Sequence, residues 1–208
     1  MPSAATTTPA LPAWRVLSGP GLGAGLANFL GGTTSVSGSR LDHGQARGGK
    51  GNSASGPPGA AFAGLGAGGG IFNWLGNYNS SSFGMLLNPS VVTVTNSTLD
   101  HNQAQGGGGG NGLGGGIANL LSATTTVDSS CLTHNHANGD GGGAGLGGGA
   151  YNDATSSLTL TTSSVTGNHA NGKPGIGGGI YNLGTFTFDA FTVIAFNHAS
   201  TSGDNIGP

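Results

Sequence analysis

The sequence predicts an all-β protein: a right-handed parallel β-helix solenoid of about five turns, with three short strands per turn and Gly-rich loops. Three observations predict it. An apolar-x-x-Asn element alternates along the chain with a Gly-Gly-Gly-apolar-x-Asn element. The pair of elements recurs with a period of about 33 residues, and no segment shows the apolar spacing of a helix.

The Gly-Gly-Gly-apolar-x-Asn element is predicted to form one strand of each turn. Its glycines can take the positive φ that a loop needs where it returns to the coil. The apolar position is expected to face inwards, as Ile71, Ile117, Ala150 and Ile180. The element occupies residues 68–73, 114–119, 147–152 and 177–182, with a degenerate copy at 23–28.

The apolar-x-x-Asn element and the residues before it are predicted to form the other two strands. Around Val94 and Leu160, apolar residues alternate with threonines, which is the period of a half-buried strand. Two apolar columns follow from aligning the repeats. The inner residues of the element are Leu41, Leu99, Leu132, Val165 and Ile194, and those of the preceding strand are Val36, Val94, Val127, Leu160 and, after a one-residue shift, Phe188.

The asparagines that close both elements are expected to be structural. Asparagine tolerates the left-handed backbone of a sharp corner, and stacked side-chain amides can bond to one another along the axis of the coil. We expect two ladders. One contains Asn73, Asn119, Asn152 and Asn182, and the other contains Asn102, Asn135, Asn168 and Asn197.

The repeat also predicts the domain organisation. Residues 1–20 are expected to be an irregular N-terminal segment, and residues 21–208 a single β-helix domain. Two intervals exceed the period by about a dozen residues, at 48–58 and 74–87, where the composition is typical of loops. We interpret both as insertions. Residues 1–12 lack the basic start and apolar run of a secretory signal. Either this chain is part of a longer one, which we expect, or its export signal lies elsewhere.

Composition excludes several classes of function. Of 208 residues, 46 are glycine, five are lysine or arginine and seven are aspartate, for a net charge of -2. No basic patch is present for a nucleic acid, and no run of about 18 apolar residues could span a membrane. A single cysteine excludes a disulfide framework, and Cys131 is expected to serve packing rather than reactivity.

The quoted repeats resemble the right-handed parallel β-helix repeats of the pectin-lyase-like group. They are similar in particular to those of polymorphic outer-membrane and autotransporter-type surface proteins of bacteria, over roughly residues 21–206. The resemblance implies a structural or adhesive module of a secreted or cell-surface protein, without catalysis or a cofactor. The partner class that it implies is a polysaccharide or a cell-surface glycan.

Two other functions remain open on this fold. A polysaccharide lyase or hydrolase needs paired carboxylates, and a basic residue beside an aspartate pair would favour it. Asp42 and Asp100 share a column, and Asp128 and Asp189 roughly share another, two turns apart. Ice binding would need a flat, uninterrupted hydroxyl face, for which the candidates are Ser35, Ser37, Thr93, Thr95, Thr126, Thr159, Thr161 and Thr187.

The histidines form two columns. One lies immediately after the ladder asparagine and contains His136, His169 and His198; the other lies immediately before it and contains His43, His101 and His134. Stacked imidazoles about 5 Å apart can ligate a transition metal. Because a repeat copies residues whether or not they function, we favour packing and expect no metal. His136, His169 and His198 are the candidates should one bind.

Overall fold

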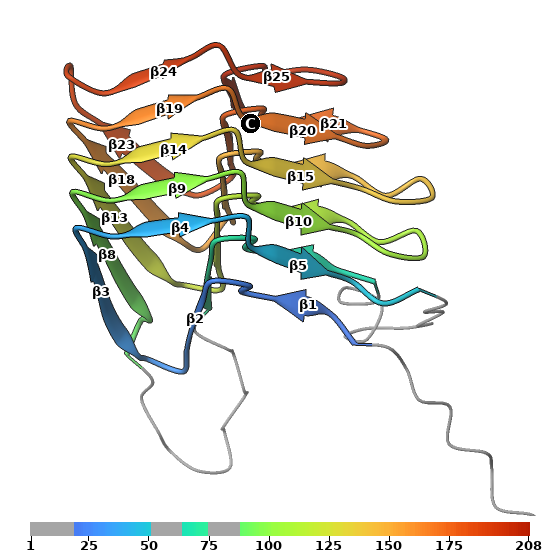
Figure 1. The fold of residues 1–208 in the computed structure, drawn as a ribbon, viewed down its shortest axis with the longest axis horizontal. Helices are drawn as coiled ribbons and strands as arrows, with labels where there is room; N and C mark the ends of the chain where they lie inside the picture. Colours follow the sequence, from blue (N-terminus) through green and yellow to red (C-terminus); the bar gives the residue numbers. More distant parts are fainter. Residues whose placement is uncertain (1–18, 51–63, 75–87) are drawn as a thin grey trace, which may run out of the picture.

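The computed structural model describes residues 19–50, 64–74 and 88–208. Within these ranges every regular element is a strand, and every strand pair is parallel. Short strands are stacked turn upon turn into five sheets that run along one axis (Figure 1). The chain is therefore a parallel β-helix solenoid of about five turns, as the repeat predicts.

Each turn contains five short strands, two more than predicted. The first turn consists of β1 (Gly21–Leu22), β2 (Leu26–Phe29), β3 (Thr33–Ser37), β4 (Arg40–Asp42) and β5 (Gln45–Arg47). The second consists of β6 (Gly66–Ala67), β7 (Ile71–Trp74), β8 (Val91–Thr95), β9 (Thr98–Asp100) and β10 (Gln103–Gln105). The third consists of β11 (Gly112–Leu113), β12 (Ile117–Leu120), β13 (Thr124–Asp128), β14 (Cys131–Thr133) and β15 (His136–Asn138).

The later turns repeat this order. The fourth consists of β16 (Gly145–Leu146), β17 (Ala150–Asn152), β18 (Ser157–Thr161), β19 (Ser164–Thr166) and β20 (His169–Asn171). The fifth consists of β21 (Gly175–Ile176), β22 (Ile180–Asn182), β23 (Thr185–Phe188), β24 (Val193–Ala195) and β25 (His198–Ala199). A last strand, β26 (Ile206–Gly207), adds to β22.

The two strands that the sequence did not predict are short and carry little apolar signal. The sheet of β5, β10, β15, β20 and β25 points only one small residue per strand inwards, such as Ala104 or Ala137. The sheet of β1, β6, β11, β16 and β21 has strands of two residues. Strands this short show too little alternation to be recognised, and glycine and alanine have low β propensity.

The predicted inward columns form the core. Leu99, Leu132 and Val165 stack in register on β9, β14 and β19 and are fully buried. Val94, Val127 and Leu160 form the second column on the neighbouring sheet. Stacking at the strand spacing of about 4.8 Å removes both columns from water and pairs the backbone of each turn with the next.

Cys131 does not pack in the core. It precedes Leu132 on β14, and successive residues of a strand point to opposite faces, so the burial of Leu132 turns Cys131 outwards. Its thiol is exposed, in one column with Thr98, Ser164 and Val193. The expectation of a packing role was therefore wrong.

The first glycine of the Gly-Gly-Gly element has the predicted backbone conformation, with φ of 60° at Gly114 and 69° at Gly147. The second is required for another reason. A Cβ on Gly148 would lie 2.4 Å from the carbonyl oxygen of Gly178 and 2.5 Å from the backbone nitrogen of His169. The glycines thus allow close approach of neighbouring backbones as well as a sharp bend.

Most of the expected N-terminal segment and both insertions fall at residues 1–18, 51–63 and 75–87, outside the described residues. The first strand begins at Gly21. In the described ranges no helix is long and apolar enough to cross a membrane.

Candidate functional site

The first asparagine ladder is continuous. The side-chain amide of Asn28 donates to the amide oxygen of Asn73 at 3.0 Å, and Asn73 donates to Asn119 at 3.1 Å. Asn119 donates to Asn152 at 2.9 Å, and Asn152 to Asn182 at 2.8 Å. Asn73, Asn119 and Asn152 are fully buried. The ladder therefore contains all the asparagines predicted for it, and Asn28 as well.

The second ladder runs from Asn102 through Asn135 and Asn168 to Asn197, with amide contacts of 2.9–3.0 Å. Each of these side chains also donates to a core carbonyl; that of Asn135, for example, donates to Leu99. Its Oδ1 accepts the backbone N–H of Asn102. The left-handed corner residue is the one before the asparagine, such as His101 or His134, so our conformational reason for asparagine was wrong.

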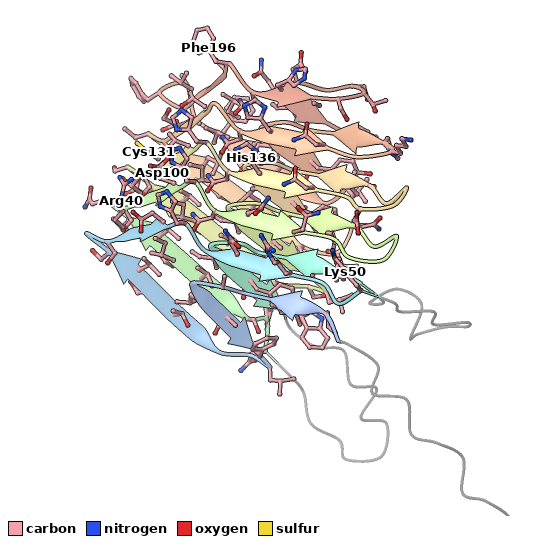
Figure 2. All side chains as sticks on the ribbon, turned by 45° about the vertical axis from the view of Figure 1, so that its right-hand side comes forward. Arg40, Lys50, Asp100, Cys131, His136 and Phe196 are labelled. Carbon is pink, nitrogen blue, oxygen red and sulfur yellow. The ribbon has the colours of Figure 1, made fainter. Side chains whose placement is uncertain are left out.

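A polar cluster surrounds Asp100 at the end of β9. Its Oδ1 lies 2.9 Å from Nδ1 of His101 and 3.3 Å from Nδ1 of His134, and accepts the Thr133 hydroxyl at 2.9 Å. Its Oδ2 accepts the Arg40 guanidinium at 2.5 Å. Figure 2 shows Arg40, Asp100 and Cys131 on one flank of the coil. We call Arg40, Asp100, His101, Thr133 and His134 the Asp100 cluster.

The repeat places the Asp100 cluster. Asp42, Asp100 and Thr133 are in register on β4, β9 and β14, so each faces the same side one turn apart. The following histidines have φ of 52° at His101 and 50° at His134, which turns both rings outwards beside the carboxylate. These rings stack at a centroid distance of 4.9 Å, and His43 stacks on His101 at 5.2 Å.

The carboxylates of the cluster are held ionised. Burial alone would raise the pKa of Asp100, but hydrogen bonds from Thr133, His101 and His134 outweigh burial and hold that pKa far below its ordinary value. The hydrogen bond from Arg40 lowers the pKa of the exposed Asp42, which lies 3.0 Å from the guanidinium. Neither carboxyl group carries a proton near neutral pH.

A basic residue beside an aspartate pair, here Arg40 beside Asp42 and Asp100, is the arrangement that would favour a polysaccharide lyase or hydrolase. The protonation states of the two carboxyl groups do not suit such an enzyme. A glycoside hydrolase needs one carboxyl group with a raised pKa as general acid, and both of these are lowered. Lyase chemistry needs a basic group free to act at the sugar, whereas Arg40 is bonded to both carboxylates.

The two aspartates of the other pair, Asp128 and Asp189, bond to different partners. Asp128 accepts the Thr161 hydroxyl at 2.8 Å. Asp189 accepts the backbone N–H of Thr162 at 3.1 Å and the Thr192 hydroxyl at 2.7 Å, and these bonds lower its pKa. Each carboxylate therefore accepts at least one hydrogen bond from an adjacent turn of the coil.

In the histidine column that was the candidate for a metal, a carboxylate lies at one end, where Oδ1 of Asp204 is 3.5 Å from Nδ1 of His198. The rings of His136 and His169 stack at 5.0 Å, whereas His198 meets His169 edge-on at 5.9 Å. Burial first, and then nearby histidines, lower the pKa of His136 and of His169. Within the described ranges, the group of three metal-capable side chains is instead Asp100, His101 and His134, whose ligand atoms lie within 4.8 Å of one another.

The hydroxyl face is regular in one column only. Ser35, Thr93, Thr126, Thr159 and Thr187 are in register, and the last two hydroxyls lie 3.1 Å apart. In the next column Asp128 stands between Thr95 and Thr161. Asp128 therefore interrupts the hydroxyl face, which does not favour ice binding.

Comparison with protein-family models, curated proteins and solved structures finds no match to this chain. The functional argument therefore rests on the residues and on their geometry.

Proposed function

We propose that this chain is a structural and adhesive β-helix module of a secreted or cell-surface protein, of the pectin-lyase-like repeat type that its motifs resemble. The observation that carries the proposal is that the buried polar side chains form hydrogen bonds within the coil. The ladder asparagines bond to one another and to core carbonyls. Such residues hold successive turns together, which is the task of a scaffold.

The scaffold presents a series of loops on one side. Glycine-rich segments at 106–111, 139–144 and 172–174 connect the last strand of one turn to the first strand of the next. These loops are stacked and project together from the coil (Figure 1). A stacked row of loops is suited to an extended partner that contacts several turns at once.

The loops border two open hollows. One, of about 210 Å³, is lined by residues that include Arg47, Lys50, Gln105 and Asp140. A second, of about 520 Å³, is lined by glycines with Lys173 and Ser200. Three of the five cationic residues of the chain thus lie on this side. We infer an acidic polysaccharide as the preferred partner, because guanidinium and ammonium groups bind carboxylate and sulfate.

The test is retention of the purified chain on immobilised polysaccharides, with depolymerisation read in the same incubation. We expect retention on acidic polymers, weakened by salt, little retention on neutral ones, and no cleavage. The double variant Arg47→Gln/Lys173→Gln is expected to reduce retention. Arg40→Gln, which removes a cation from the Asp100 flank, is the matched control. Cleavage of any polymer, or retention on none, would contradict the proposal.

A further inference from the structure

We propose that the Asp100 cluster binds one divalent first-row transition metal ion, with Oδ1 of Asp100 and Nδ1 of both His101 and His134 as ligands. This site differs from the column of His136, His169 and His198, the candidates from the sequence should a metal bind. It combines two imidazoles with a carboxylate, a donor set that such ions prefer and that Mg²⁺ and Ca²⁺ do not.

The separations between the three donor atoms fit a metal ion. Zinc binds imidazole nitrogen and carboxylate oxygen at about 2.0–2.2 Å, so two ligands of a tetrahedral site lie about 3.4 Å apart. Oδ1 of Asp100 lies 2.9 Å from Nδ1 of His101 and 3.3 Å from Nδ1 of His134. All three atoms lie within 4.8 Å of one another. The three donor atoms thus lie close to the spacing that a bound ion needs.

The fold holds the ligands in place. Asp100 is 8% exposed, and both histidines occupy left-handed corners immediately before buried ladder asparagines. In the stacked arrangement the ring centroids lie 4.9 Å apart and the ring planes differ by 21°, so the rings must tilt towards each other for both Nδ1 lone pairs to point at one ion. Ligands that are already ordered lose little entropy when the ion binds.

The surroundings of the carboxylate suit a single-oxygen ligand. Arg40 bonds to Oδ2 and leaves Oδ1 facing the histidines, while Thr133 donates to Oδ1. Partners of this kind orient metal-binding carboxylates in proteins. Arg40 adds a positive charge that opposes a cation, but its side chain is 55% exposed, so solvent and salt screen that repulsion.

The outer side of the site is open. The side chains of His101 and His134 are 48% and 58% exposed. Water can therefore complete the coordination sphere, and binding releases to solvent any proton that a ligating nitrogen carries. The neighbouring His43, stacked on His101, extends the row but is not required as a ligand.

The test is calorimetric titration of the metal-free, tag-free chain with ZnCl₂, supported by the visible spectrum of the Co²⁺ form. We expect one zinc ion per chain, and no heat with Mg²⁺ or Ca²⁺. His134→Phe keeps a stacked ring but removes the nitrogen, and Asp100→Asn weakens the oxygen ligand. Each is expected to reduce zinc affinity about tenfold or more.

His169→Phe is the matched control, because it makes the same change in the other histidine stack, beside His136. It is expected to leave zinc affinity unchanged, with all variants checked by circular dichroism for an intact fold. The proposal would be overturned if the parent chain bound no zinc at a concentration of about 1 mM. That concentration corresponds to a binding free energy of only roughly 4 kcal/mol. An equal loss in His134→Phe and His169→Phe would overturn it too.

Discussion

At the scale of the residue, the buried asparagines determine how strongly neighbouring turns are joined. Asn135 is fully buried; it donates to Leu99 and Asn168 and accepts from the backbone of Asn102. An apolar residue at this position would leave several buried polar groups without a partner. Such groups cost about 1–3 kcal/mol each when unsatisfied.

Asn135→Ala is therefore expected to lower the free energy of unfolding by about 2–4 kcal/mol. Asn138→Ala is the control, because the Asn138 side chain is only partly buried and accepts one bond, from Asn171. Chemical denaturation of both variants measures the difference. Equal, small losses would show that the ladder contributes little to stability.

A second prediction concerns pH. The pKa of His136 and of His169 is held below the ordinary 6.5, by burial first and by nearby histidines second. Below about pH 6.5 the unfolded chain binds protons that the folded chain resists, so stability falls as the pH drops from there towards the lowered values. Above that range these two groups contribute no pH dependence.

His136→Gln is expected to reduce this loss in acid, because Gln103 already occupies the same column one turn earlier. Melting temperatures of the parent and the variant, measured from pH 8 to pH 5, provide the test. If the melting temperatures of variant and parent fell in parallel from pH 8 to pH 5, the loss of stability in acid would not come from His136.

The sequence predicts residues whose role repeats, and it misses those that act in one turn only. The apolar column of Leu132 and both ladder asparagines recur in at least four aligned copies, so their columns could be seen. The contact between Arg40 and Asp100 joins two residues 60 positions apart and has no copy in later turns. The sequence showed the shared column of Asp42 and Asp100, but Arg40 has no counterpart in the aligned copies, where Thr98, Cys131, Ser164 and Val193 stand.

At the scale of the element, each strand buries one face and exposes the other. Leu132 on β14 is fully buried between Leu99 and Val165, whereas the adjacent Cys131 is exposed. Single substitutions on this strand can therefore separate the two faces.

Leu132→Ala is expected to destabilise the fold by about 2–5 kcal/mol, through lost burial and the cavity left in the column. Cys131→Ser copies Ser164 of the next turn and is expected to change stability by less than about 0.5 kcal/mol. The two midpoints of thermal unfolding check the inward assignment. A larger effect from Cys131→Ser than from Leu132→Ala would reverse it.

Prediction at this scale succeeds where a strand is long enough to alternate. The five residues of β8 and of β18 show that pattern clearly. The pairs Gly112–Leu113 and Gly145–Leu146 do not, because their strand conformation comes from pairing with adjacent turns and not from local propensity.

At the scale of the whole molecule, the solenoid is a stack of equivalent turns, and its stability is approximately the sum of the turns and of the contacts between neighbours. His136 pairs with His169 and Asn135 with Asn168, so one turn corresponds to 33 residues. Removing one whole turn should bring matching columns together, whereas removing half a turn should not. The same regularity makes the chain a scaffold in our account.

The most direct test of this account is a pair of deletions compared by circular dichroism and thermal unfolding. Deletion of residues 136–168 joins Asn135 to His169 and is expected to keep the β-type spectrum and a cooperative transition, at a reduced melting temperature. Deletion of residues 136–152 breaks the register and is expected to abolish the transition. If the whole-turn deletion were as disruptive as the half-turn deletion, the chain would not be a solenoid of interchangeable turns.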